Sequence, residues 1–491
     1  MYRKKDKSQL TFEDYQLPFS GRLSAENRWV KMASLIPWEM VEDEYAQSFK
    51  NEVADGRPPI PARMAFGALH IKEHEGLTDE RVVENAAENP YMQYFLGLHE
   101  FRQEKPFDPS MMVHFRKRFS SEAIQRINDE LYRRLHAEQE PPEDGGDAGK
   151  SDGEEESPAT PAEDNAGTLI LDATVAPADV RFPMDLSLLN ECRENTERMI
   201  DEIWEHTARN GHKTTYSRKK ARRAYLKVAK QRKPRRNAIR KAVGEQLEYV
   251  EKNLGTLERL MRQAPEGALA EKRLTRLAVI REVAAQQREM WDAQTNRCEN
   301  RILSLRQPHV RAIYRGKAGH AWEYGQKLAL SVVDGFTFIE KQSWEPFNEG
   351  NTLQDSAEAY RKRHGVYPQA ILADTIYRTR ENRQFCKSKG IRLSGPRLGR
   401  PKASELDDDR MQAYRDNCER NVIEGKNGVA KRRFGLDLIM AYLDCSAMTE
   451  AAMTIFAMNL AHAMRVFLHR LFLTLFHRLF RWELVYIEVV Q

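Results

Sequence analysis

Residues 168–183, which read TLILDATVAPADVRFP, decide the fold together with residues 370–374, which read AILAD. Each stretch is an apolar run that leads into an aspartate, Asp172 in the first and Asp374 in the second. Buried strands read as short apolar runs, and sites in α/β folds form at the carboxyl ends of such strands. The pattern predicts two strands that each end in an aspartate, with the two carboxylates side by side.

The sequence around these two runs predicts the rest of a mixed sheet. Residues 311–345 read as two or three strands with a hairpin turn at Val333-Asp334-Gly335, and a helix follows that Gly365 ends. Residues 186–307 have almost unbroken helical composition. We therefore expect an α+β, helix-rich multidomain chain, in which a mixed β-sheet core carries a large helical insertion and follows an all-helical N-terminal domain.

A third acid stands in residues 411–436, MQAYRDNCERNVIEGKNGVAKRRFGL. In a helix, Arg420, Glu424 and Lys431 fall within roughly 40° of one line, together with Asn417. A carboxylate flanked by cations suits a metal-binding acid beside groups that hold phosphate. Spacing alone favours the alternative of a solvated face with weak ion pairs.

The chain has 491 residues, 41% of them hydrophobic, and a formal net charge of +5. This composition excludes a disordered protein, but the modest net charge hides a basic segment, because residues 206–244 contain no Asp or Glu. A polyanion is the natural partner of such a segment, and the alternative is a solvated basic helix. The candidate phosphate-contacting residues are Arg218, Lys219, Lys220, Arg222, Arg223, Arg235 and Arg236.

Shifts in composition predict the domain boundaries. We expect a helical DNA-binding domain at 1–137, with Arg116, Lys117 and Arg118 on one helix, and an acidic flexible linker at 138–166. The first part of the core follows at 167–185, the basic insertion at 186–308 and the remainder of the core at 309–445. Charges interrupt the apolar C-terminal stretch at 446–491, which favours amphipathic helices over a membrane span.

Five scattered cysteines and an N-terminus without an apolar run favour a reducing cytoplasm and no signal peptide. Three ionised carboxylates brought together would repel one another unless divalent cations neutralise them. Mg²⁺ prefers oxygen ligands, and two such ions suit an in-line attack on a phosphodiester.

These motifs resemble those of the bacterial insertion-sequence DDE transposases, which have an RNase H-like core and a Y-x2-R-x3-E-x6-K signature. The likeness runs through RPPIPARMAFGALHIKEHEGLTDERVVE, LILDATVAPADVRFPMDLSLLNE, YRGKAGHAWEYGQKLALSVVDGF and ILADTIYRTRENR to the Glu424 helix. It implies that Asp172, Asp374 and Glu424 are the catalytic metal ligands for two Mg²⁺, with Mn²⁺ as a substitute. Arg420 and Lys431 match the cations of the signature, and Tyr377 matches an aromatic residue of the family, so these three are expected to contact DNA.

The resemblance also implies an activity: binding of terminal inverted repeats, strand cleavage and joining to target DNA by a homodimer. A cytoplasmic, nucleoid-associated protein without a membrane segment is expected. Asn417 stands where the signature has Tyr, and Ile376 where a small residue is usual. A structure-specific nuclease and a non-catalytic DNA-binding descendant remain as alternatives.

Overall fold

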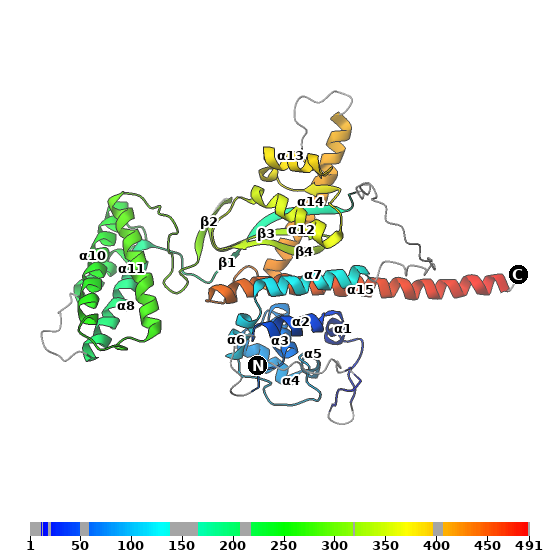
Figure 1. Ribbon diagram of the computed structural model, residues 1–491, viewed down its shortest axis with the longest axis horizontal. Helices are drawn as coiled ribbons and strands as arrows, with labels where there is room; N and C mark the ends of the chain where they lie inside the picture. Colours follow the sequence, from blue (N-terminus) through cyan, green and yellow to red (C-terminus); the bar gives the residue numbers. More distant parts are fainter. Residues whose placement is uncertain are drawn as a thin grey trace, which may run out of the picture. The chain divides into compact units, whose positions relative to one another are not determined.

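The computed structural model describes residues 11, 13–17, 21–49, 58–137, 165–206, 218–317, 320–395 and 406–489 (Figure 1). It divides into two compact units. The core unit comprises residues 1–177, 327–343 and 347–491, and the insertion unit comprises residues 178–326 and 344–346. Most of the acidic segment expected as a linker, and the basic residues at 209–217, lie outside the described residues.

The sheet has six strands, and β1 (Thr168–Pro177) lies between β3 (His320–Val333) and β5 (Ala370–Leu372). β5 runs parallel to β1, and β6 (Arg392–Leu393) runs parallel to β5. The two remaining strands, β2 (Arg311–Lys317) and β4 (Phe336–Ser343), pair antiparallel with the first and second halves of β3. The expected mixed sheet is therefore present.

The turn between β3 and β4 confirms the predicted hairpin. Asp334 and Gly335 both have positive φ, 50° and 79°, as a two-residue hairpin turn of the primed type requires. The carboxylate of Asp334 also accepts a hydrogen bond from the Tyr132 hydroxyl at 2.8 Å. The turn is thereby attached to the helix that carries Tyr132.

The N-terminal region of the core unit is helical, as expected. Asn27, Thr78 and Asn89 cap three of its helices through their side chains. The helices are α1 (Arg28–Leu35), α2 (Trp38–Gln47), α3 (Ala62–Glu75), α4 (Asp79–Glu88), α5 (Pro90–Phe95), α6 (Met111–Arg118) and α7 (Ser121–Ala137).

One long helix, α15 (Asp444–Val489), lies in the C-terminal part of the core unit, and its first part packs against α3, α6, α7 and β4. Residues 449–460 are all buried, so this part is a core helix rather than an amphipathic one. By length and composition Asp444–His469 could cross a membrane, but 67% of its apolar window is buried inside the protein. A buried core helix of this kind has the same composition as a membrane span.

Buried polar groups fix this packing. The Lys72 ammonium forms ion pairs with Glu73 at 2.8 Å and with Glu450 of α15 at 2.9 Å. Glu450 also accepts hydrogen bonds from the backbone N–H groups of Met440 and Ala441. Because every partner in this network is engaged, the charges tolerate burial.

The insertion unit is a helical bundle with its own apolar core. Its helices are α8 (Asp185–His206), α9 (Arg218–Ala229), α10 (Arg236–Met261) and α11 (Glu271–Asp292). Leu189, Leu247, Val250 and Ile280 are fully buried in it. Ordinary apolar burial therefore holds this part together. The buried Arg193 of α8 adds hydrogen bonds to Asn190 and Gln246 inside the bundle.

Short elements connect the sheet to the last helices of the core unit. Gly365, with φ of 82°, ends α12 (Leu353–His364) as predicted. The others are η2 (Glu349–Thr352), η3 (Thr375–Tyr377), α13 (Arg380–Ser388) and α14 (Leu406–Phe434).

Candidate active site

The register of the sheet brings Asp172 and Asp374 to the same level. Thr168 pairs with Ala370 and Ile170 with Leu372, so two further residues along each strand lead to the two aspartates. Side chains two residues apart point to the same face of a strand. Neighbouring parallel strands lie about 4.8 Å apart. Asp172 therefore shares the face of Ile170 on β1, and Asp374 lies two residues past the end of the neighbouring strand β5.

One detail of the prediction was wrong. Asp172 does not end its strand, because β1 continues to Pro177. The run TVAP after Asp172 is also buried in part, with Val175 fully buried, and it extends the strand. β5, by contrast, stops at Leu372, two residues before Asp374.

The chain around Asp374 is held by many contacts. The Asp374 carboxylate caps η3 by accepting a hydrogen bond from the Thr375 N–H at 2.7 Å. The Asn382 amide donates to the carbonyls of Gly350 at 2.6 Å and of Tyr377 at 2.8 Å. A Cβ at Gly350 would lie 2.6 Å from the Ile376 carbonyl oxygen, so the two loops touch through backbone.

Tyr377 is fully buried beneath this turn. Its pKa is raised first by burial, and then by the negative charges of Glu349, Asp172 and Asp374. Both aspartates are thus near its hydroxyl. Because Tyr377 is inaccessible in this conformation, its placement suits support of the turn rather than the DNA contact expected from the sequence.

Glu424 lies on α14, the long helix next to β1 and β5. Asp416, Ile423, Ala430 and Phe434 form the buried side of this helix. The Glu424 carboxylate is 56% exposed and pairs with the Arg420 guanidinium at 3.3 Å. The weak ion pair that spacing predicted as the alternative is therefore present.

The same side of α14 also reaches the first acid. The Asn427 amide donates to Asp172 Oδ2 at 2.9 Å. At 3.6 residues per turn, Arg420, Glu424, Asn427 and Lys431 share one side of the helix. The hydrogen bond therefore turns the side that carries Glu424 toward the strand that carries Asp172.

Two other contacts fix α14 on the core unit. Arg392 of β6 donates to the buried Asp416 carboxylate at 2.6 Å. Lys426 donates to the Gly335 carbonyl, and burial, followed by the charge of Arg465, lowers the Lys426 pKa to about 8. Sequence reasoning missed Asn427 and Lys426, although the spacing of Asn427 from Glu424 placed it on the same side.

The two positions that depart from the signature are both on the surface. Asn417 is exposed, and the Ile376 side chain is 48% exposed. Neither residue disturbs the packing of the acids. Within the described ranges, no three His, Cys, Asp or Glu side chains gather closely enough to hold a metal ion.

The predicted phosphate-contacting residues fall into two groups. The Arg218 guanidinium forms a bidentate pair with Asp201, at 2.7 and 2.9 Å, and so anchors α9 to α8. The exposed residues of the set are Lys219, Lys220, Arg222, Arg223, Arg235 and Arg236. An open cavity of about 600 Å³ on α9 is lined by Lys220, Arg223, Ala224, Leu226, Lys227 and Lys230.

The basic residues of the N-terminal region are engaged in packing. Arg116 is buried and pairs with Asp79 at 2.6 Å, and Arg118 lies over the Phe49 ring and donates to the Ser48 carbonyl. Lys117 alone of these three is exposed.

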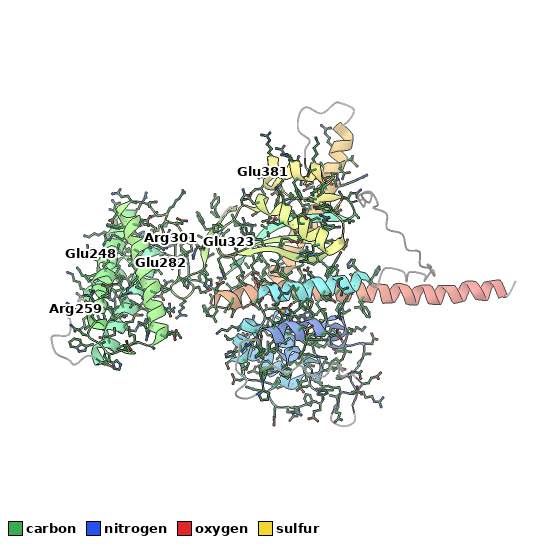
Figure 2. The ribbon with its side chains drawn as sticks, viewed as in Figure 1. Glu248, Arg259, Glu282, Arg301, Glu323 and Glu381 are labelled. Carbon is green, nitrogen blue, oxygen red and sulfur yellow. The ribbon has the colours of Figure 1, made fainter. Side chains whose placement is uncertain are left out.

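Side chains cover both units in Figure 2, where Arg301 and Glu323 of the insertion unit and Glu381 of the core unit are labelled.

Two segments of the chain match known protein families. Residues 371–461, which include Asp374 and Glu424, match the family described as the transposase DDE domain. Residues 18–118 match a second family, described as a transposase domain (DUF772). These two matches support an insertion-sequence DDE transposase.

An uncharacterized protein of Rhizobium meliloti, ORF8 of the nfe locus, is 34% identical to this chain over 98 residues. That match covers 20% of the chain and 46% of the relative, so the chain spans about half of the relative's length. No solved structure matches. The DDE domain implies an RNase H-like core, which agrees with a helix-covered mixed sheet.

Proposed function

We propose that the protein is a DNA transposase that binds the terminal inverted repeats of an insertion sequence and catalyses metal-dependent strand cleavage and strand transfer. One observation carries this proposal. β1, which carries Asp172, pairs in parallel with β5, which leads into Asp374, and Asn427, on the Glu424 side of α14, donates a hydrogen bond to Asp172. One acid on β1, one after the end of β5 and one on α14 support a site for phosphodiester chemistry.

The three carboxylates have the chemistry that divalent cations prefer, but they do not gather within ligand distance in the described conformation. Carboxylate oxygens of Asp172, Asp374 and Glu424 would hold two Mg²⁺, or Mn²⁺, which supply charge neutralisation and an activated nucleophile when bound. Glu424 is exposed and held by one weak ion pair, so it can exchange Arg420 for another partner. Asp374 is already oriented by the Thr375 N–H.

Cations of the chain bind and orient the DNA. Arg420 and Lys431 flank Glu424 on the same side of α14, where each can contact a phosphate of the strand to be cleaved. The exposed Lys and Arg side chains of α9 and its flank contact the DNA backbone without reading sequence. Pairing of two element ends and a target duplex calls for a homodimer.

The direct test uses DNA that carries the flanks of the coding region. We expect Asp172→Asn, Asp374→Asn and Glu424→Gln each to reduce end cleavage by at least about 10³-fold while DNA binding persists. Asn421→Ala, an exposed substitution on α14, serves as the matched control. Normal cleavage by Asp374→Asn would refute the assignment.

A second assay separates a transposase from a nuclease. Pre-nicked ends with a free 3′-hydroxyl are incubated with target plasmid and Mg²⁺, and joined products are measured. We expect joined products with the wild-type chain and none with Glu424→Gln. Cleavage without any joining would favour the structure-specific nuclease.

Backbone binding by α9 is tested by charge reversal. The combined change of Lys219, Lys220, Arg222 and Arg223 to Glu should weaken binding to all duplexes alike. The slope of log K against log salt should fall by about one unit per lost phosphate contact. Loss of preference for one sequence, with general affinity kept, would show that α9 reads bases instead.

A further inference from the structure

Asn427 is the residue through which α14 touches the strand of the first acid. It stands one turn after Glu424, and its Nδ2 donates to Asp172 Oδ2 at 2.9 Å. A carboxylate can only accept, so the nitrogen of the amide must face Asp172. This contact fixes the orientation of the amide and one oxygen of the acid together.

The other end of the same amide is unsatisfied. Asn427 Oδ1 is buried and has no hydrogen-bond partner among the described residues. An unsatisfied buried acceptor is destabilising, so an amide with a purely structural role would normally pair both ends. In a site that substrate or a cation completes, this oxygen can accept a hydrogen bond from the substrate or act as a ligand to the cation, which is a reason to leave it unpaired.

We propose that Asn427 is a positioning residue for Asp172. Its N–H holds the carboxylate in the rotamer that takes a divalent cation, and its place on α14 couples the position of Glu424 to that of Asp172. This inference rests on the proposed function, because it assumes that Asp172 and Glu424 hold the cations. Outer partners of this kind typically change metal affinity by about 10- to 100-fold when removed.

The chemistry of the side chain makes the inference specific. An aspartate at 427 would have the same shape, but it could not donate and would repel Asp172 when ionised. An alanine would remove both the donor and the unsatisfied acceptor. A bound cation should therefore stabilise the Asn427→Asp protein more than the wild type and the Asn427→Ala protein less.

The experiment compares the full-length wild type, Asn427→Ala, Asn427→Asp and Asn421→Ala. The Mg²⁺ concentration that gives half-maximal cleavage is measured with DNA that carries the flanks of the coding region. The change in Tm on adding Mg²⁺ is measured in the presence of the same DNA. We expect Asn427→Ala to raise the half-saturating Mg²⁺ about 10- to 100-fold. We expect Asn427→Asp to lower the Mg²⁺-free Tm and to enlarge the Mg²⁺-dependent rise in Tm.

Asn421 stands on an exposed side of the same helix, so Asn421→Ala should match the wild type in both measurements. A wild-type Mg²⁺ requirement in Asn427→Ala would overturn the inference, as would equal Mg²⁺-dependent changes in Tm across all four proteins. Asp172→Asn keeps the two ideas apart. If Asp172→Asn abolishes cleavage while Asn427→Ala needs the same Mg²⁺ concentration as the wild type, the proposed function stands. The positioning role of Asn427 is then refuted.

Discussion

The turn at Asp374 and the exposed side of α14 at Glu424 hold their acids in different ways. Asp374 is oriented by a backbone N–H, and the loop around it is held by Asn382 and by backbone contact at Gly350. Glu424 is more than half exposed and has one ion pair within its own helix. The proposed site would therefore combine a preorganised acid, Asp374, with an adjustable one, Glu424, and such a pair suits the proposed reaction, in which DNA enters before the last ligand closes.

The largest effect on stability is expected in the turn that holds Asp374. Asn382→Ala should lower the free energy of unfolding by about 2–4 kcal/mol, because two carbonyls, those of Gly350 and Tyr377, lose their donor. Chemical denaturation measures it, and cleavage should fall with it. A change below about 0.5 kcal/mol would show that the Asp374 turn is held by other contacts.

An intermediate effect is expected where α14 joins the β3–β4 turn. The folded-state pKa of Lys426, about 8, lies below the ordinary lysine value of 10.5, so the unfolded chain binds the proton more tightly. The burial of charged Lys426 therefore destabilises the folded state, and the whole of this penalty is present below pH 8. The penalty decreases as pH rises from 8 toward 10.5.

Lys426→Met removes the titrating group. Compared with this variant, the wild type should gain stability between pH 8 and 10.5, by on the order of 2 kcal/mol. Thermal unfolding of both proteins across that range provides the measurement. Parallel pH curves would mean that Lys426 is not buried in solution.

The smallest effect on stability is expected at the ion pair of Glu424 with Arg420. A double-mutant cycle with Arg420→Ala and Glu424→Ala should give a coupling free energy below about 1 kcal/mol, and added salt should reduce it. Denaturation at low and high salt measures the coupling. A salt-independent coupling of several kcal/mol would mean that Glu424 is fixed like Asp374, and the contrast between the two regions would vanish.

The sequence predicted the parts of this site that depend on local pattern. The two apolar runs, the hairpin at Asp334-Gly335 and the end of α12 at Gly365 follow from strand composition and glycine conformation. The extent of β1 beyond Asp172 was missed, since the apolar run pauses at the acid while the strand continues.

Contacts between distant segments could not be predicted from one sequence. Nothing local in Arg116 or Arg218 shows that their charges meet Asp79 and Asp201. The burial of Tyr377 and the long reach of α15 through the core unit also depend on tertiary packing. The same holds for the Asn427 bond to Asp172, which joins residues far apart in the chain.

The pairing of β1 with β5 has a kinetic consequence. It joins residues about 200 positions apart, so an unfolded chain must close a long loop before the two aspartates meet. The insertion unit lies inside this loop and has a core of its own, whose helix-to-helix contacts are closer in sequence. If that bundle forms first, the loop that remains is much shorter, and local helical contacts are the fast ones. Cleavage competence should therefore appear late in refolding, after most of the helical signal has recovered.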